Sequence, residues 1–485
     1  MPTKMMKTKF SKLTVILFYA IIGGGGGAAG ADSEMKGSKP NIVFFLGDDQ
    51  SKFDHSTYGN VAVPTPTTDA LAKEGLVFER AFTGQAICAP SRSMLYTGLY
   101  PLRNGCFINH SPIRPGVQTL PKYLSDLGYT VVLAGKSHVN PDAQFPWSIR
   151  MEPVQEEGLP RPSIPIQEMD KLMKDQGSKP FCLMIASEFP HGPYFDESPY
   201  KADDVSLPPF ADSTEEAKKK ATLYYASIAQ KERELASVLK LLEKHGIEDQ
   251  TIVFYADDHG VTRGKYTAYD SGLNVAFIVR WPGNVPPGRT NALSSFADFV
   301  PTVIELAGGT PPEDLDGMSL LPILEKGEGK QHEYVYGVTV NQGIIYRHVF
   351  PQRSVHDGRY HYIFNFNSME RLERERAKGN EVNYFIEKGA SKYRHLPEEM
   401  LFDTQSDPHE LSNLAGRPEM ADVQQSLKTE LFRWMKEQND YLSEDGPLPF
   451  LQTNKKFSLD RADEGHPIPK RMIGSLKGKT IDPHR

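Results

Sequence analysis

The chain has 485 residues, of which 39% are hydrophobic and 24% are charged, and its formal net charge is -7. This composition is typical of a globular protein that is long enough for one large core and a smaller domain. The negative net charge, together with the lack of any long lysine or arginine block, argues against a nucleic-acid partner.

The first 31 residues differ from the rest of the chain. Several lysines precede the apolar run "LTVILFYAII", which is followed by a glycine tract and by small residues at Ala29 and Ala31. This order is typical of a secretory signal peptide that is cleaved near Ala31, and the apolar run is too short for a stable membrane span. We therefore expect a periplasmic or secreted protein. In an oxidising compartment Cys106 and Cys182 could pair, which would leave Cys88 alone.

Two apolar runs, "NIVFFLGDDQ" at 41–50 and "QTIVFYADDHG" at 250–260, end in paired aspartates. Such runs predict strands that are buried on both faces of a parallel sheet. Between them, helix-like segments alternate with further apolar runs, which indicates βαβ order. The helix-like segments are 67–75, 119–128 and 215–245, and the further apolar runs are 129–138 and 180–192.

A strand at 274–283 and a helix at 296–309 are expected next, and the pattern changes near residue 332. Residues 333–340 and 353–366 alternate apolar and polar side chains around an Asp357-Gly358 turn, which predicts antiparallel hairpins. An amphipathic helix is expected at about 418–438. The sequence thus predicts an α/β fold with a catalytic domain at 38–331 and a smaller C-terminal α+β subdomain at 332–485.

Ionisable side chains follow four of the predicted strands, where ligands bind in open parallel sheets. They are Asp48, Asp49, Lys136, His138, His191, Asp257, Asp258 and His259. Carboxylates from two strand ends form a cluster of hard oxygen donors that implies calcium or magnesium, and a zinc pattern is absent. Lysines and histidines facing a metal suit a tetrahedral oxyanion such as sulfate or phosphate. The pattern favours a hydrolase of oxyanion esters.

Cys88 lies in "CAPSRSMLYTG", two residues before a proline that favours the first turn of a helix. A side chain at a helix N-terminus is placed where anions and nucleophiles are stabilised. Cys88 is therefore a candidate nucleophile, although a buried structural cysteine would read the same way.

The motifs "CAPSRSMLYTG", "GYTVVLAGKSH", "PHGPY" and "DDHG" resemble those of the type I sulfatases of the alkaline-phosphatase superfamily, and the resemblance extends from residue 41 to residue 415. It implies an alkaline-phosphatase-like fold: a large, mostly parallel mixed sheet between helices, with a C-terminal antiparallel sheet. It also implies that a maturation enzyme converts Cys88 to formylglycine (3-oxoalanine), which Arg92 holds. One calcium ion would bind Asp48, Asp49, Asp258, His259 and residue 88 itself.

The same resemblance assigns catalytic roles to Lys136, His138 and His191, and sulfate binding to Lys265. Three positions depart from the family pattern: His259 replaces a commoner asparagine, Tyr96 replaces an aliphatic residue, and the span from His259 to Lys265 is short. Asp257 is either a spare metal ligand or a neighbour of the site.

Within the family, "DDHGVTRGKYTAY", "GKSHVNP" and "FPQRSVHDGRY" are most similar to the heparan N-sulfatase branch and its bacterial polysaccharide-sulfatase relatives. That likeness implies a sulfated glycan as the substrate, carrying an O-sulfate or an N-sulfate. Arg353 and His110 are candidate contacts to a carboxylate or neighbouring sulfate of the glycan. Two alternatives stay open: a phosphate or phosphonate monoester hydrolase, and a non-catalytic, calcium-stabilised glycan-binding protein.

Overall fold

The structure, a computed structural model, describes residues 1, 33–175, 177–261, 263–340, 348–451 and 480–481. The expected signal peptide lies outside these residues, apart from Met1. No helix in the described ranges combines the length and apolar character that a membrane crossing needs.

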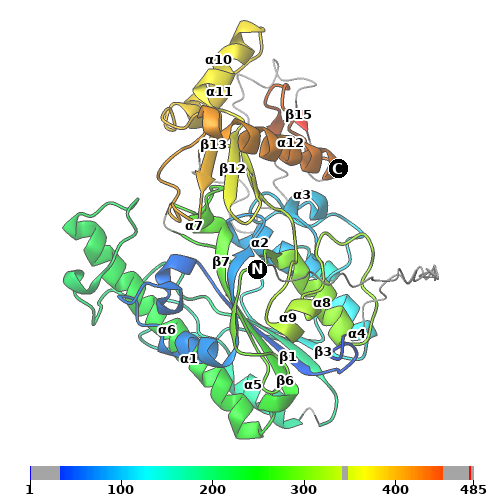
Figure 1. Ribbon diagram of the computed structural model, residues 1–485. Helices are drawn as coiled ribbons and strands as arrows, with labels where there is room; N and C mark the ends of the chain where they lie inside the picture. Colours follow the sequence, from blue (N-terminus) through cyan, green and yellow to red (C-terminus); the bar gives the residue numbers. More distant parts are fainter. Residues whose placement is uncertain (2–32, 176, 262, 341–347, 452–479, 482–485) are drawn as a thin grey trace, which may run out of the picture.

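A large mixed sheet forms the centre of the molecule (Figure 1), with the strand order β4-β3-β5-β1-β6-β7-β2-β8 and a short β9 beside β2. β1 runs parallel to both β5 and β6, whereas β7 is antiparallel to β6 and β2. The expected mixed, mostly parallel sheet is confirmed. The strands are β1 (Asn41–Gly47), β2 (Leu76–Phe82), β3 (Thr130–Gly135), β4 (Ile149–Met151), β5 (Phe181–Ala186), β6 (Thr251–Asp257), β7 (Asn274–Arg280), β8 (Gly288–Thr290) and β9 (Ser294–Ser295).

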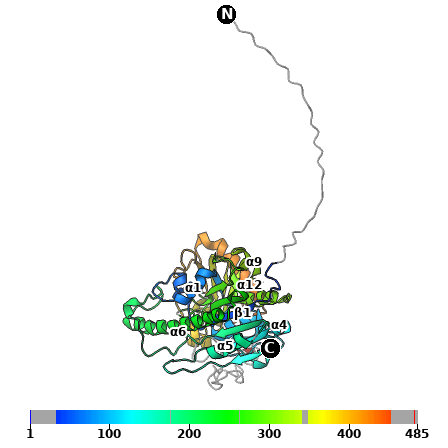
Figure 2. The same cartoon turned by 90° about the horizontal axis from the view of Figure 1, so that it is seen from below.

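Helices cover both faces of this sheet. On one face Val43 and Phe45 of β1 pack against α1 (Pro66–Glu74), α5 (Ile166–Asp175) and α6 (Glu215–His245). On the other face Phe44 packs among α2 (Cys88–Thr97), α4 (Leu120–Asp126), α8 (Phe299–Leu306) and α9 (Leu321–Lys326). Figure 2 shows α6 as one long rod beside α1. Because both faces are buried, β1 needs the continuous apolar run that its sequence has.

The long helix follows the sequence prediction. α6 begins after Thr214, whose hydroxyl accepts the Ala217 N–H, and ends at Gly246 in a left-handed conformation with φ 62°. β2 is a strand that the pattern did not predict. Its middle carries Glu79 and Arg80, and its register with β7 shifts between Phe78 and Ala81, so the period of alternation is broken there.

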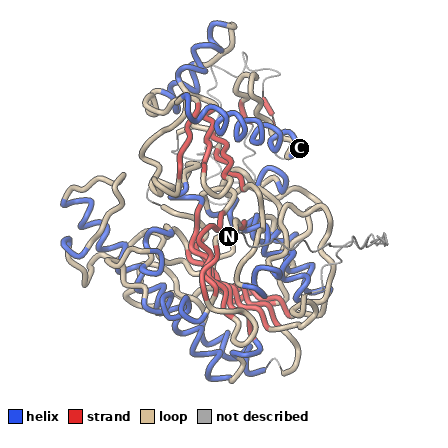
Figure 3. Tube along the Cα trace, viewed as in Figure 1, coloured by secondary structure: helices blue, strands red, loops and turns tan. Residues whose placement is uncertain are grey.

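A second, four-stranded antiparallel sheet with the order β10-β11-β12-β13 follows, as expected (Figure 3). Its strands are β10 (Val335–Thr339), β11 (Gln352–His356), β12 (Tyr360–Asn365) and β13 (Glu399–Asp403), and α12 (Ala421–Glu437) packs on it. The Asp357 carboxylate accepts the N–H groups of Arg359 and Tyr360, which closes the predicted hairpin turn.

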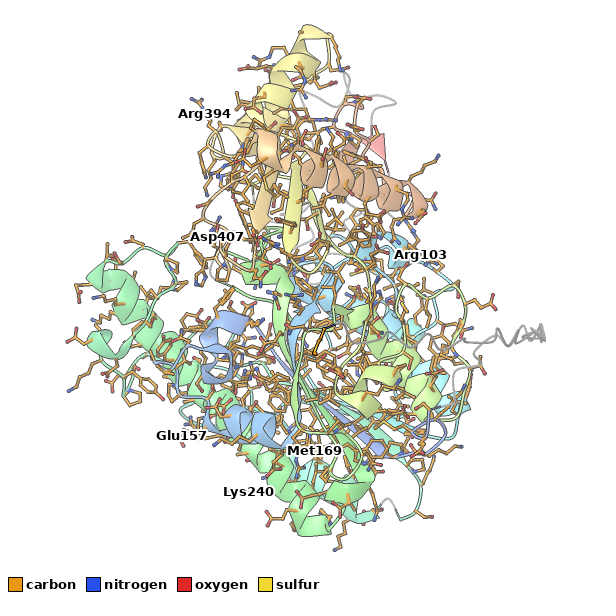
Figure 4. All side chains as sticks on the ribbon, in the orientation of Figure 1. Arg103, Glu157, Met169, Lys240, Arg394 and Asp407 are labelled. Atoms are coloured by element: carbon orange, nitrogen blue, oxygen red, sulfur yellow. The ribbon has the colours of Figure 1, made fainter. Side chains whose placement is uncertain are left out.

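The remaining α-helices and strands are α3 (Pro101–Asn104), α7 (Asp270–Leu273), α10 (Met369–Ala377), α11 (Asn383–Phe385), β14 (Phe450–Leu451) and β15 (Thr480–Ile481). In Figure 4, Arg394 and Asp407 mark the part of the molecule that holds the second sheet, and Met169 and Lys240 mark the opposite end. The core around Phe44 also contains Val355 and Trp434, so the two sheets share a continuous interior. The domain boundary at 331/332 stays a prediction.

Candidate active site

Carboxylates from two neighbouring strands meet at the carboxyl edge of the large sheet. Asp48 and Asp49 follow β1, and Asp258 follows β6, its parallel partner. The Asp49 N–H donates to Asp258 Oδ1 at 3.1 Å, and Asp48 and Asp258 are fully buried. Asp49 has a left-handed backbone with φ 68°, a strain of the kind that clusters at functional sites.

Cys88 is the first residue of α2 and points into this carboxylate cluster. Its Sγ lies 3.7 Å from Asp48 Oδ1, 3.4 Å from His259 Nε2 and 3.9 Å from Lys265 Nζ. Burial opposes the thiolate, but Lys265 and Lys136 outweigh it and lower the pKa of Cys88 to about 6. The expected position at a helix N-terminus is therefore what the fold produces, in a strongly electropositive pocket.

Arg92, one turn further along α2, crosses to the end of β6. Its Nε and Nη2 lie 3.1 Å and 3.0 Å from Asp258 Oδ2, and Nη2 lies 3.7 Å from Asp48 Oδ1. Ser91 Oγ donates to the Asp258 carbonyl at 2.6 Å. Two consecutive α2 side chains thus fix Cys88 relative to Asp258.

Each remaining carboxylate of the cluster has a lysine partner. Lys136, just after β3, contacts Asp48, and Lys265 contacts both Asp49 oxygens at 2.7 and 2.8 Å. Although burial disfavours the charge of Asp48, Lys136 and Arg92 hold its pKa well below the usual range. For Asp258, burial and the nearby Asp48 prevail over His259 and Arg92, so its pKa rises to about 7.

Three histidines line the same edge. His259 Nε2 lies 3.3 Å from Asp49 Oδ1; burial opposes its charge, but Asp258 and Cys88 raise its pKa to about 9. His191 Nδ1 lies 2.6 Å from the Gly192 carbonyl, which can only accept, so Nδ1 carries a proton, and Nε2 faces Asp49 Oδ2, 3.6 Å away. Burial and Lys136 hold the pKa of His138 well below its ordinary value, so this ring is neutral near pH 7.

His110 adjoins this edge of the sheet because it contacts His138. The two rings meet with His138 Nε2 and His110 Nδ1 2.8 Å apart, and both residues have left-handed backbones. The structure thus brings together ten of the predicted site residues. They are Asp48, Asp49, Cys88, Arg92, Lys136, His138, His191, Asp258, His259 and Lys265, and His110 adjoins them.

One expectation from the sequence needs correction, and one question that the sequence left open is decided. Arg353 is 0% exposed, and its guanidinium bonds Asp440 at 2.9 Å and the Thr339 carbonyl at 2.9 Å, so it serves as a buried ion pair and does not face a glycan. Cys106 and Cys182 are both free: the thiol of Cys106 donates to the Ser111 carbonyl, and Cys182 lies within β5.

Asp257 is a neighbour of the site and not a spare ligand. Its carboxylate accepts hydrogen bonds from Lys231 Nζ and His55 Nε2, both at 2.8 Å, and Lys231 also contacts Gln50. Sequence reasoning missed Lys231, which is fully buried on α6. A signal was available, because Lys231 is three residues after Ile228 and four before Leu235, on the face that turns inwards.

Asn109 is a second residue that the sequence did not single out. Its Oδ1 accepts the Ala89 N–H at 3.2 Å, and its amide lies 3.2 Å from His110 Nε2. Since Ile87 provides no side-chain cap for α2, Asn109 satisfies one of the free N–H groups beside Cys88 from a distant loop.

The donor set fits a hard divalent cation. Ligand atoms of Asp48, Asp49, Cys88 and His191 lie within 4.8 Å of one another, and Cys88, Asp258 and His259 form a second such set around the same thiol. Carboxylate oxygens are the ligands that calcium prefers. Within the described ranges, Arg92 Nη1 is buried without a hydrogen-bond acceptor, which leaves it available for an oxygen on residue 88.

A nucleophile at a helix start, carboxylates for a cation, and lysines and histidines for an anion define a hydrolase of oxyanion esters. The comparisons with known proteins narrow this class. The Sulfatase family matches residues 40–157 and 162–309, and the N-sulphoglucosamine sulphohydrolase C-terminal family matches residues 258–390. The chain belongs to the sulfatase family and is a sulfuric ester hydrolase.

Two curated relatives extend over nearly the whole chain. It is 45% identical to an "Ulvan-active sulfatase" of Formosa agariphila, covering 90% of this chain and 89% of that protein. It is 26% identical to the human "N-sulphoglucosamine sulphohydrolase", covering 83% of this chain and 91% of that one.

A solved structure described as being in complex with its substrate D-glucosamine-2-N,6-O-disulfate has a TM-score of 0.65 at 20% identity. The match covers 83% of this chain and 99% of that one. At this identity the likeness supports the fold alone.

Proposed function

We propose that this sulfatase is exported and removes sulfate from a sulfated carbohydrate, using calcium and a formylglycine made from Cys88. The observation that carries the proposal is the setting of Cys88, whose Sγ lies within 4 Å of Asp48, His259 and Lys265 at the start of α2. The Sγ of the encoded cysteine marks the place of the formyl oxygen. Calcium held by Asp48, Asp49, Asp258 and His259 would supply positive charge that lowers the pKa of an oxygen on residue 88.

The cationic side chains would bind the sulfate. Lys265 Nζ is 3.9 Å from Cys88 Sγ, and Lys136 is anchored on Asp48 beside the same atom, so both ammonium groups face an anion placed on residue 88. Charge-assisted hydrogen bonds from such groups strengthen as negative charge develops on the sulfate oxygens. Arg92, whose guanidinium is fixed by Asp258, would hold residue 88 in place.

The histidines would move protons. His191 Nε2 is turned towards the cluster and would donate a proton to the departing sugar oxygen or nitrogen when the sulfur bond breaks. His138 is neutral, because burial and Lys136 lower its pKa, and can therefore accept a proton from a group on residue 88.

The substrate class rests on the relatives. The relative with 45% identity is ulvan-active, and the human relative is an N-sulphoglucosamine sulphohydrolase. Both names describe enzymes that act on a sulfated carbohydrate, and the higher identity of the ulvan-active relative favours a sulfated polysaccharide, or an oligosaccharide derived from it, as the substrate.

Mass spectrometry of the peptide that contains Cys88, after co-expression with a formylglycine-generating enzyme, tests the modification. We expect the mass of the aldehyde, and an intact thiol in active enzyme would overturn this part. Sulfate release from ulvan oligosaccharides, N-sulfoglucosamine and a matched phosphate ester tests the reaction. If the enzyme turns over the phosphate ester but releases sulfate from neither sulfated sugar, this result would contradict the proposed substrate.

In a parallel assay, Cys88→Ser should lose turnover and keep the melting temperature of the parent. Retained activity in this variant, with the serine unmodified, would show that the formylglycine is dispensable.

A further inference from the structure

We propose that a pocket beside α6 binds the sugar ring next to the one that carries the scissile sulfate; this inference rests on the proposed function. The pocket has a volume of about 350 Å³ and lies between α6 and the segment that follows His191. Its walls combine aromatic, small and charged side chains. They include Tyr194, Ala217, Lys220, Ala221, Tyr224 and Tyr225.

The pocket adjoins the catalytic cluster through a shared wall. Tyr224 lines the pocket, and its hydroxyl lies 3.0 Å from the Asp49 carbonyl and 3.1 Å from Asp54 Oδ2. Tyr194 follows His191 by three residues, and Val261, which also lines the pocket, follows His259 by two. A chain of sugars whose sulfate reaches residue 88 would therefore pass this opening.

The lining has the chemistry of a carbohydrate site. The rings of Tyr194 and Tyr224 lie 5.6 Å apart between centroids, and together they offer aromatic surface to the C–H face of a pyranose. Lys220 and Asp212 stand on the exposed side of the pocket, and Asp54 lies deeper, so hydroxyl groups find both donors and acceptors. Convergent polar groups on a mostly apolar wall are typical of small-ligand sites of about 300–1,000 Å³.

Lys220 gives the pocket a preference for a sugar that carries a negative charge. In the described part of the chain Lys220 makes no ion pair, whereas Lys218 on the same turn pairs with Glu215. An ammonium group without a carboxylate partner is available for an anionic substituent, which the units of a sulfated polysaccharide carry. The occupant we infer is thus a pyranose ring of the same glycan chain that bears an acidic group.

The test uses the full, matured enzyme and variants that fill or neutralise the pocket. Ala221→Trp places an indole in the cavity, Ala217→Trp does the same one turn earlier, and Lys220→Ala removes the ammonium. Lys219→Ala is the matched control, because Lys219 is exposed on the same helix and does not line the pocket. For each protein we would compare kcat/KM on size-fractionated ulvan oligosaccharides with kcat/KM on 4-nitrophenyl sulfate, which has no second ring.

We expect each pocket variant to lower the ratio of the two kcat/KM values by about tenfold, mainly through KM for the oligosaccharide, and Lys219→Ala to leave the ratio unchanged. Equal ratios in all variants that fold would overturn the inference. Binding of desulfated ulvan oligosaccharides, measured by calorimetry, separates this inference from the proposed function. Binding that the pocket variants weaken, in a parent that releases no sulfate from glycans, would support the pocket and contradict the proposed reaction. If the parent hydrolyses the sulfated glycan but all variants bind the oligosaccharides equally well, the proposed reaction is supported and the inference about the pocket is contradicted.

Discussion

Arg92 Nη2 lies 3.0 Å from Asp258 Oδ2, with both side chains fully buried. This contact joins the start of α2, which carries Cys88, to the end of β6, which carries a proposed calcium ligand. The planar guanidinium bonds the same oxygen through Nε at 3.1 Å, so it fixes an orientation that a single ammonium cannot.

We therefore expect Arg92→Lys to lower kcat by about 10²–10³-fold, the loss that follows removal of one preorganised donor at a reacting centre. Steady-state rates on the best sulfate ester and a thermal melt would be measured together. Arg103→Lys is the matched control, because Arg103 pairs with Asp316 outside the cluster. A variant with the parent rate would show that the fork of Arg92 does not position residue 88.

Two adjacent aspartates should respond in different ways. Asp258→Asn removes a carboxylate from the proposed calcium ligands, so we expect weaker calcium binding by calorimetry and loss of activity at low calcium. Asp257→Asn removes the partner of Lys231, and a buried charge left unpaired costs about 3–5 kcal/mol of unfolding free energy. A larger loss of calcium affinity in Asp257→Asn than in Asp258→Asn would reverse the assignment.

The loss of rate on substitution of His191 should increase with the basicity of the leaving group. We expect His191→Ala to slow release from a sulfated sugar by about 10²–10⁴-fold, because the departing oxygen needs a proton. The loss on 4-nitrophenyl sulfate should be much smaller, since nitrophenolate leaves without one. His395→Ala, an exposed histidine of the C-terminal part, provides the control. An equal loss on both esters would argue for a binding role of His191 and against proton transfer.

The sequence predicted the large sheet and most of the site for one physical reason. Strands buried on both faces give continuous apolar runs, and parallel strands bring their ends to one edge, so Asp48 and Asp258 had to be neighbours. β2 escaped prediction because Glu79 and Arg80 interrupt its pattern at a bulge.

Contacts between residues that are distant in the sequence could not be predicted from local sequence patterns. The pairing of Arg353 with Asp440 joins β11 to a loop 87 residues later. Nothing in the sequence around either residue indicates that the other is its partner. The same holds for Asn109, which reaches the first turn of α2 from 20 residues away. Cys106 and Cys182 satisfied the count for a disulfide, but the fold leaves both thiols free.

Glu234 on α6 should make stability fall as the pH rises. It is 3% exposed, and burial raises its pKa to about 7, although Ser163 and the Ile164 N–H donate to its Oε1. Between pH 4.5 and 7 the folded state holds the proton that the unfolded state releases, so up to about 3 kcal/mol of unfolding free energy is lost across this window. Glu234→Gln keeps the accepting oxygen and carries no charge, so urea unfolding at pH 5 and pH 8 should show a smaller drop than in the parent. Glu243→Gln, exposed on the same helix, should keep the parent drop, and an equal drop in Glu234→Gln would show that Glu234 stays ionised in the folded protein.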